Sequence, residues 1–224
     1  MSPLRAVVFD MDGVIVDSHP AHCLAWKEFL LAFGREVTDG ELEFVLDGRK
    51  RDEILCHFLG RLTGEQLQAY GKLKDEFFWR TASEVVPIPG VLEFIESIRD
   101  AGITLAVATS ASAARTRSTL DRLGLLPCFK TVVTGNDVCE GKPHPDIYRL
   151  ACQRANLAPG STVAIEDAPS GVRAAKGAGL RCAAIAGPQS QKALSAAGAD
   201  CILDNFLDLS FSQFQSMLGM HKHA

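Results

Sequence analysis

Short apolar runs separated by longer amphipathic segments fill the chain after residue 90, and this alternation predicts parallel strands joined by helices. We expect one strand near the start and five later ones: Ala6–Phe9, Thr104–Ala108, Thr131–Val133, Thr162–Ile165, Arg181–Ile185 and Cys201–Leu203. Glycines stand where the intervening helices should end: Gly102, Gly124, Gly179 and Gly198. The predicted class is α/β, with a doubly wound, Rossmann-like parallel sheet.

Residues 17–84 follow a different pattern, in which apolar side chains recur every three or four positions. Trp26 and Phe29 belong to one such stripe, and two more follow within residues 42–46 and 54–59. This spacing predicts helices, and no strand pattern interrupts it.

The helical block separates the first strand from the others, so we expect an all-helical cap inserted after strand one. The cap would comprise residues 17–85, and the α/β catalytic core residues 1–16 and 86–224. The chain would cross between them near Val16–Ser18 and Val85–Pro89. Two-segment insertions over a site commonly act as lids, and these crossings would then be the hinges.

The composition is that of an ordinary globular protein, with 224 residues, 47% of them hydrophobic and 22% charged. A formal net charge of -4 gives no reason to expect a nucleic-acid or membrane-surface partner. The chain enters its first strand without the apolar region of a signal peptide, and no apolar run approaches the roughly 18 residues of a membrane span. We therefore expect a cytoplasmic monomer that acts on a small molecule.

The seven cysteines are widely scattered, and no two form a C-x-x-C pair. Zinc sites need clustered ligands, and disulfide scaffolds are typical of small secreted domains. We expect the cysteines to be reduced and to serve mostly as small buried hydrophobic residues.

Asp10 and Asp12 stand two apart where the first apolar run ends, and Gly13 follows them. In open α/β sheets, chemistry collects beyond the carboxyl ends of the strands. Side chains two apart on an extended chain share a face, so both carboxylates would project into that crevice. An Asx-type turn that closes an ordinary strand explains the same residues equally well.

Two later strand ends supply hydroxyl and ammonium groups. Thr109 and Ser110 precede a helix, so their hydroxyls and the first N–H groups of that helix could hold phosphate oxygens. A helix N-cap role is compatible with this. Lys142 stands in the stiff stretch Gly141–Pro145, where it could neutralise phosphate as a point cation or simply be solvated.

Glu166 and Asp167 end another predicted strand as adjacent acids. Adjacent carboxylates repel each other unless a cation joins them. We expect hard oxygen ligands for Mg²⁺ from Asp10, from the Asp12 carbonyl, and from Asp167 and Glu166, because Mg²⁺ prefers carboxylates, waters and substrate phosphate. An N-cap acid beside an exposed one would explain this stretch alone, but not its coincidence with the other three.

Four stretches resemble, in the same order, the motifs of the haloacid dehalogenase-like phosphohydrolase superfamily: Asp10–Gly13, Thr109–Ser110, Lys142–Pro143 and Glu166–Asp167. The resemblance spans the predicted core. It implies that Asp10 is a nucleophile that becomes an aspartyl-phosphate, and that Asp12 is the general acid and base. Because members that dehalogenate or cleave phosphonates lack an acid at the second position, the presence of Asp12 disfavours both activities.

The helical block resembles the cap of the branch that contains β-phosphoglucomutase and sugar-phosphate phosphatases. The stretch His22–Lys27 is similar to that branch's His-x-x-Ala-Trp-Lys, in which Trp26 is the aromatic residue. By this resemblance Arg51 corresponds to an arginine for the distal phosphate of the substrate. Lys74 corresponds to a cap lysine that the mutases also use.

Each of these cap residues also has a plain structural explanation. Trp26 at helical spacing is typical of core packing, and His22 could be a surface histidine. Arg49, Lys50 and Arg51 could form an exposed charge run. Three basic residues on a lid that faces core acids would, however, favour a phosphorylated substrate.

The combined prediction is a Mg²⁺-dependent phosphatase of small phosphorylated metabolites, sugar phosphates above all. If a sugar hydroxyl rather than water accepted the phosphoryl group, the chain would instead be a β-phosphoglucomutase that interconverts β-glucose 1-phosphate and glucose 6-phosphate. A catalytically inactive phosphometabolite-binding protein is a third alternative. Such a protein would have little reason to keep Asp10, Asp12, Lys142 and Asp167 together.

Overall fold

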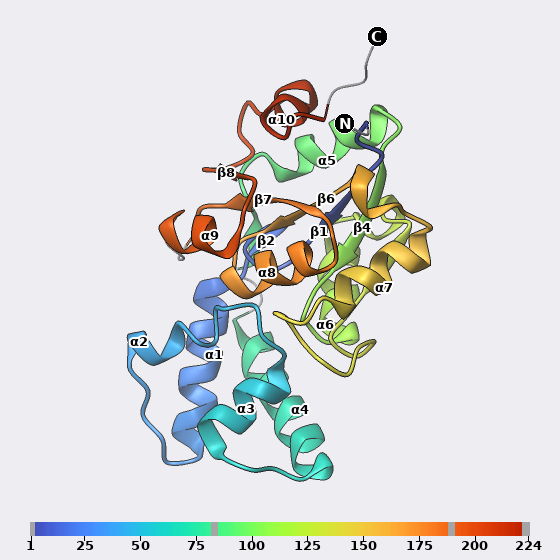
Figure 1. The fold of residues 1–224 in the computed structure, drawn as a ribbon. Coiled ribbons are helices and arrows are strands. Elements are labelled where there is room, and N and C mark those ends of the chain that lie inside the picture. Colours follow the sequence, from blue (N-terminus) through green and yellow to red (C-terminus); the bar gives the residue numbers. More distant parts are fainter. Residues whose placement is uncertain (1–2, 82–84, 188–190, 221–224) are drawn as a thin grey trace.

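A parallel sheet forms the centre of the molecule in the computed structural model, which describes residues 3–81, 85–187 and 191–220 (Figure 1). Six strands of the described residues compose it: β1 Ala6–Phe9, β4 Thr104–Ala108, β5 Thr131–Val133, β6 Thr162–Glu166, β7 Arg181–Ile185 and β8 Cys201–Leu203. Their spatial order is β5-β4-β1-β6-β7-β8, and each neighbouring pair is parallel. The chain winds outward from β1 in both directions, which confirms the predicted doubly wound class.

Helices cover both faces of the sheet, because successive side chains of a strand point to opposite faces. Val7 and Phe9 of β1 contribute to one apolar cluster, and Val8 contributes to the other. The first cluster includes residues of α5 Val91–Asp100, α6 Ala113–Arg122 and α10 Phe211–Met217, together with Ala21, Ala25 and Phe78 from the helices described next. The second is completed by three other helices: α7 Asp146–Ala155, α8 Pro169–Gly177 and α9 Gln191–Ala197.

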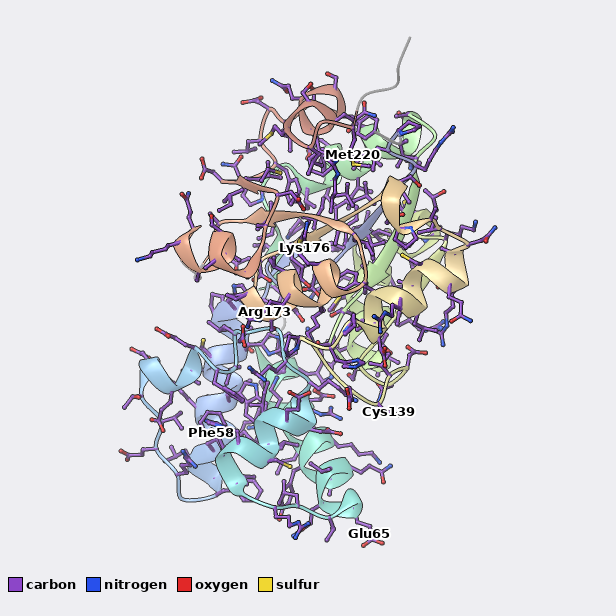
Figure 2. The ribbon with its side chains drawn as sticks, in the orientation of Figure 1. Phe58, Glu65, Cys139, Arg173, Lys176 and Met220 are labelled. Carbon is purple, nitrogen blue, oxygen red and sulfur yellow. The ribbon has the colours of Figure 1, made fainter. Side chains whose placement is uncertain are left out.

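The helices between β2 and β3 gather at one end of the sheet, apart from those that cover its faces (Figure 1). They are α1 His19–Ala32, α2 Asp39–Leu42, α3 Arg51–Leu59 and α4 Gly64–Arg80. They enclose an apolar cluster of their own around Trp26, Phe29 and Phe58, the last of which is labelled in Figure 2. We call these four helices and their connecting loops the cap. No helix in the described ranges is both long and apolar enough to cross a bilayer.

A short antiparallel ladder joins the two crossings between cap and core. β2 Val16–Asp17 pairs with β3 Val86–Pro87, so that Val16 lies opposite Pro87. These strands are two residues long, which is too short to produce a sequence alternation, and the sequence pattern did not predict them. The ladder lies at both predicted hinges. The division at residues 16/17 and 85/86 stays a prediction.

Candidate active site

The candidate site forms where three neighbouring strands end. Asp10 follows β1, Thr109 follows β4, and Glu166 closes β6 directly before Asp167. Strands β4, β1 and β6 are adjacent and parallel, so their carboxyl ends meet at one edge of the sheet. The backbone fixes this meeting, since the Asp10 N–H donates to the Ile165 carbonyl at 2.9 Å.

Three buried carboxylates come together at this edge. Asp10, Glu166 and Asp167 each offer an oxygen, and these oxygens lie within 4.8 Å of one another. The Lys142 ammonium donates to Asp10 Oδ1 at 2.6 Å and to Glu166 Oε1 at 2.5 Å. The Tyr148 hydroxyl donates to the same Glu166 oxygen at 2.5 Å. We call Asp10, Glu166 and Asp167 the acidic cluster. It holds more negative charge than Lys142 alone can balance.

The acidic cluster fits a divalent cation. Burial raises the pKa of Asp10 although Lys142 opposes the rise, and burial also raises the pKa of Asp167. Asp167 Oδ2 is buried and pairs with His19 Nε2 at 3.0 Å, and no other described residue donates to it. Gly13, with φ +74°, lies so close that an added Cβ would stand 2.1 Å from this oxygen. Hard oxygens with surplus negative charge are what Mg²⁺ prefers.

The carboxylate of Asp12 faces Arg115 instead of the acidic cluster. Arg115 Nη1 and Nη2 donate to its two oxygens at 2.7 and 2.6 Å, and the Ser18 hydroxyl donates at 2.5 Å. Burial opposes ionisation of Asp12, but the Arg115 charge outweighs it and holds the pKa of Asp12 well below its usual range. The Asp12 carbonyl as a metal ligand stays a prediction.

The two predicted phosphate-binding hydroxyls already have partners. The Thr109 hydroxyl oxygen accepts from the Ala111 N–H at 3.2 Å. The Ser110 hydroxyl donates to the Gly48 carbonyl of the cap at 2.6 Å. The N-cap of α6 is neither of these residues but Ser112, whose side chain accepts from an N–H of the first turn. The N-cap interpretation of Thr109 and Ser110 was therefore wrong by two to three positions.

A loop of the cap fastens onto the core around these hydroxyls. Besides the bond between Gly48 and Ser110, the Ser170 N–H donates to Asp47 Oδ1 at 3.1 Å, and the Ser170 hydroxyl donates to the Asp47 carbonyl. Lys50 Nζ donates to the Val138 carbonyl at 2.8 Å. We call residues 47–50 the closing loop, since its contacts join cap to core across the site.

The basic run does not face the core acids as a unit, which corrects the expectation for Lys50. Its ammonium binds the carbonyls of Val138 and Cys139 on a core loop; Cys139 is labelled beside the cap in Figure 2. Arg49 pairs with Asp47 within the closing loop, at 3.1 Å. The side chains of consecutive basic residues are long and flexible, so each of them can bind a different acceptor.

Arg51 forms an ion pair that its sequence position did not suggest. Arg51 Nη1 donates to Asp75 Oδ2 of α4 at 2.7 Å and to the Gly71 carbonyl at 3.0 Å. Arg51, which the resemblance assigns to the distal phosphate of the substrate, is thus paired with an acidic residue of the cap itself.

His22 and Lys74 contact each other over an aromatic floor. Lys74 Nζ lies 3.0 Å from His22 Nδ1, and 5.4 and 5.0 Å from the ring centres of Trp26 and Phe78. Burial, together with the Arg115 charge, lowers the pKa of Lys74 to about 7. Burial also lowers the pKa of His22 to about 3, so His22 is neutral and accepts from Lys74. Trp26 is 1% exposed and packs in the cap, as its plain interpretation predicted.

Residues of cap and core line a partly open cavity of about 80 Å³. Most of the predicted site residues line it: Asp10, Asp12, His22, Trp26, Arg51, Lys74, Thr109, Ser110 and Asp167. Lys142 and Glu166 do not, and Lys142 adjoins the cavity through Asp10. Glu166 is engaged by Lys142 and Tyr148, which makes it a support for the cluster rather than an open ligand.

Sequence reasoning missed four side chains of the site: Arg115, His19, Asp75 and Tyr148. Arg115 did leave a signal. It stands in the first turn of α6, where the helix dipole disfavours cations, so a buried arginine there indicates a specific anionic partner. The other three reach the site through helix placement, which spacing alone does not specify.

Fold and site together define an enzyme class. The chain belongs to the haloacid dehalogenase-like hydrolase family, whose model matches residues 7–185 and so spans all four predicted motifs. Within it the chain falls in the β-phosphoglucomutase-like, sugar-phosphate phosphatase branch. It is an enzyme that hydrolyses or transfers phosphoric monoesters.

Relatives of similar length support this placement. The chain is 34% identical to a phosphorylated carbohydrates phosphatase of Thermotoga maritima, over 79% of this chain and 82% of that one. It is 29% identical to the β-phosphoglucomutase of Bacillus subtilis, over 92% of each. A crystal structure of a CbbY variant from Rhodobacter sphaeroides in complex with xylulose 1,5-bisphosphate has a TM-score of 0.83 at 31% identity, covering 94% of this chain and 98% of that one.

Replacing Arg115 should destabilise the protein, because Asp12 would keep its partly buried position without its counter-charge. We expect Arg115→Met to lower the free energy of unfolding by about 3 kcal/mol or more near neutral pH. Urea denaturation in EDTA measures this with no metal at the acidic cluster. Arg117→Met, an exposed change on the same helix, is the matched control and should change stability by about 0.5 kcal/mol or less.

The decrease in the free energy of unfolding caused by Arg115→Met should depend on pH in a defined direction. The folded-state pKa of Asp12 is depressed, so its stabilising contribution is present above the unfolded-state value of about 3.9 and disappears as the pH falls through the folded value. The gap between wild type and Arg115→Met should therefore narrow in acid. Equal gaps at about pH 3 and about pH 7 would contradict the assigned pair.

Proposed function

We propose that the chain is a Mg²⁺-dependent phosphatase of small phosphorylated metabolites, sugar phosphates above all, and that it acts through an aspartyl-phosphate on Asp10. One observation carries this proposal. The Lys142 ammonium lies 2.6 Å from Asp10 and 2.5 Å from Glu166, within a buried acidic cluster at the cavity wall. The Lys142 charge favours the ionised form of Asp10 against the burial that raises its pKa, and an ionised carboxylate can attack a phosphoryl group.

The metal would be held by the carboxylates of Asp10 and Asp167 and by the Asp12 carbonyl. Bound there, Mg²⁺ would offset the charge of the cluster and of the transferring phosphoryl oxygens. Glu166 would orient Lys142 rather than bind the metal, because its Oε1 already accepts hydrogen bonds from Lys142 and Tyr148. His19, 3.0 Å from Asp167, would keep that carboxylate turned toward the cavity.

In the first half of the proposed reaction, an Asp10 oxygen attacks phosphorus and the bond from phosphorus to the ester oxygen breaks. The departing oxygen takes a proton from Asp12 and leaves as an alcohol. In the second half, Asp12 takes a proton from water while the water oxygen attacks the aspartyl-phosphate. The bond from phosphorus to Asp10 breaks, and inorganic phosphate leaves.

The Arg115 contact bears on both roles of Asp12. Paired as it is, at 2.6 and 2.7 Å, Arg115 stabilises the ionised form of Asp12, which suits acceptance of a proton from water. Donation to the leaving group requires a protonated Asp12, so Arg115 must withdraw during the first half. Arg115 lines the cavity, where the phosphoryl oxygens of a substrate would compete for it.

Substrate entry requires the closing loop to open. The cavity of about 80 Å³ is far smaller than the ~300 Å³ or more typical of ligand pockets. The contacts of Asp47, Gly48 and Lys50 with the core would break to admit substrate and form again to exclude water. A relative named for phosphorylated carbohydrates supports the choice of substrate class. The cytoplasmic location and the monomeric state stay predictions.

The second candidate function is a β-phosphoglucomutase. His22, Arg51 and Lys74 all line the cavity, as the mutase resemblance implies, and a relative of 29% identity carries that name. Both functions share the first half of the reaction. They differ in whether water or a sugar hydroxyl takes the phosphoryl group.

Removing the metal should stop the reaction. Dialysis against EDTA should reduce the turnover of p-nitrophenyl phosphate by about 10²-fold or more, because the charge of the acidic cluster would then repel the phosphate, and excess Mg²⁺ should restore it. Circular dichroism of the dialysed protein controls for unfolding. Full turnover in EDTA by the folded protein would contradict the proposed metal dependence.

The acceptor is identified by the products. With β-glucose 1-phosphate and a trace of glucose 1,6-bisphosphate, or with a panel of sugar monophosphates, we expect inorganic phosphate to appear. Conversion to glucose 6-phosphate without free phosphate would establish the mutase instead. Binding of sugar phosphates without any turnover would support the inactive binding protein.

A further inference from the structure

The ion pair between Arg51 and Asp75 is built into the cavity from three elements. Arg51 begins α3, Asp75 lies on α4, and the Ser112 hydroxyl at the start of α6 donates to Asp75 Oδ2 at 3.3 Å (Figure 1). Both charged side chains line the cavity and are about one quarter and one fifth exposed. The guanidinium lies against Gly71, where an added Cβ would stand 2.5 Å from it. This close approach fixes Arg51 beside Asp75.

The other guanidinium groups of the cavity wall, among the described residues, are neutralised as well. Arg49 lies 3.1 Å from Asp47, and Arg115 lies 2.6 Å from Asp12. Lys74 faces the neutral ring of His22 rather than a carboxylate. Among the residues that the structure describes, Lys74 thus has no carboxylate partner, and burial lowers its pKa to about 7, whereas each of these guanidinium groups is matched by an acid.

Asp75 changes what Arg51 can recognise. A phosphate group placed on Arg51 would approach the Asp75 carboxylate, and two anions a few ångströms apart repel each other strongly where water is excluded. A hydroxyl group meets no such repulsion, since it can donate to Asp75 and accept from Arg51. Arg51 Nε supports this, because it is buried without a hydrogen-bond partner in the described part of the chain and can donate.

We propose that Asp75, paired with Arg51, is a specificity determinant that selects substrates whose end remote from the reacting phosphate is an uncharged, hydroxyl-bearing chain or ring, and that it rejects bisphosphates. This inference rests on the proposed function and narrows it to sugar and polyol monophosphates. It also weighs against the mutase, because transfer to a sugar hydroxyl passes through a bisphosphate that this end of the cavity repels.

Binding measurements test the inference without requiring turnover. Dissociation constants are measured by calorimetry with Mg²⁺ present, for glucose 6-phosphate against glucose 1,6-bisphosphate and for fructose 6-phosphate against fructose 1,6-bisphosphate. Every protein compared, including the one called wild type here, carries Asp10→Asn so that the ligands are not turned over. Wild type should bind the monophosphates at least about tenfold more tightly. Asp75→Asn, which keeps the shape and removes the charge, should shift that ratio by about tenfold or more toward the bisphosphates.

Two further variants keep the result interpretable. Glu76→Gln removes one negative charge from the neighbouring exposed position and should leave the ratio unchanged. Arg51→Gln leaves Asp75 without its counter-charge and should move the ratio in the opposite direction to Asp75→Asn. The inference is overturned if wild type prefers the bisphosphates, if Asp75→Asn and Glu76→Gln give the same ratio, or if neither sugar class binds. Absent turnover by the protein that keeps Asp10, with the expected ratios, would instead overturn only the proposed phosphatase function.

Discussion

The site depends on how a buried ammonium group divides its charge between two carboxylates. Lys142 lies within hydrogen-bond distance of Asp10 and Glu166, and all three are almost fully buried. Removing charged groups from water is costly unless opposite charges compensate for each other closely. Lys142 compensates for part of the acidic cluster, and Asp167, which lines the cavity, is paired with His19. The proposed Mg²⁺ would compensate for the remaining negative charge at this edge of the sheet and would also bind the phosphate ester.

Charge pairing also governs the rest of the cavity wall. Arg115 holds Asp12, Arg51 holds Asp75, and Arg49 holds its neighbour Asp47. A ligand that binds one of these arginines must therefore displace the aspartate with which that arginine is paired. The closing loop adds to this, since its main-chain carbonyls accept bonds from core hydroxyls. In the proposed reaction, opening would break the contacts of the closing loop, and release of Asp12 would break its pair with Arg115.

Most of the fold and the core of the site could be predicted from the local sequence pattern. The strands are continuous apolar runs, which are readily recognised, and β6 extends by only one residue, Glu166, beyond its prediction. The acids and hydroxyls at strand ends could be predicted to meet, because the carboxyl ends of parallel strands share an edge. Ion pairs that involve side chains of helices could not be predicted. Arg115 with Asp12, and Asp75 with Arg51, depend on how α6, α3 and α4 are placed, and many placements satisfy the same helical spacing. Lys50 binding to core carbonyls and Ser110 binding to the cap depend on closure, which leaves no mark on local pattern.

The most direct test of this account looks for the covalent intermediate. Wild-type protein with Mg²⁺ and a sugar monophosphate is quenched in acid during turnover, digested, and examined by mass spectrometry beside Asp10→Asn. The account predicts a phosphoryl group on Asp10 in wild type, lost when the sample is made alkaline, and none in the variant, which should also be inactive. Turnover of the Asp10→Asn protein, or a phosphoryl group on another residue, would contradict it.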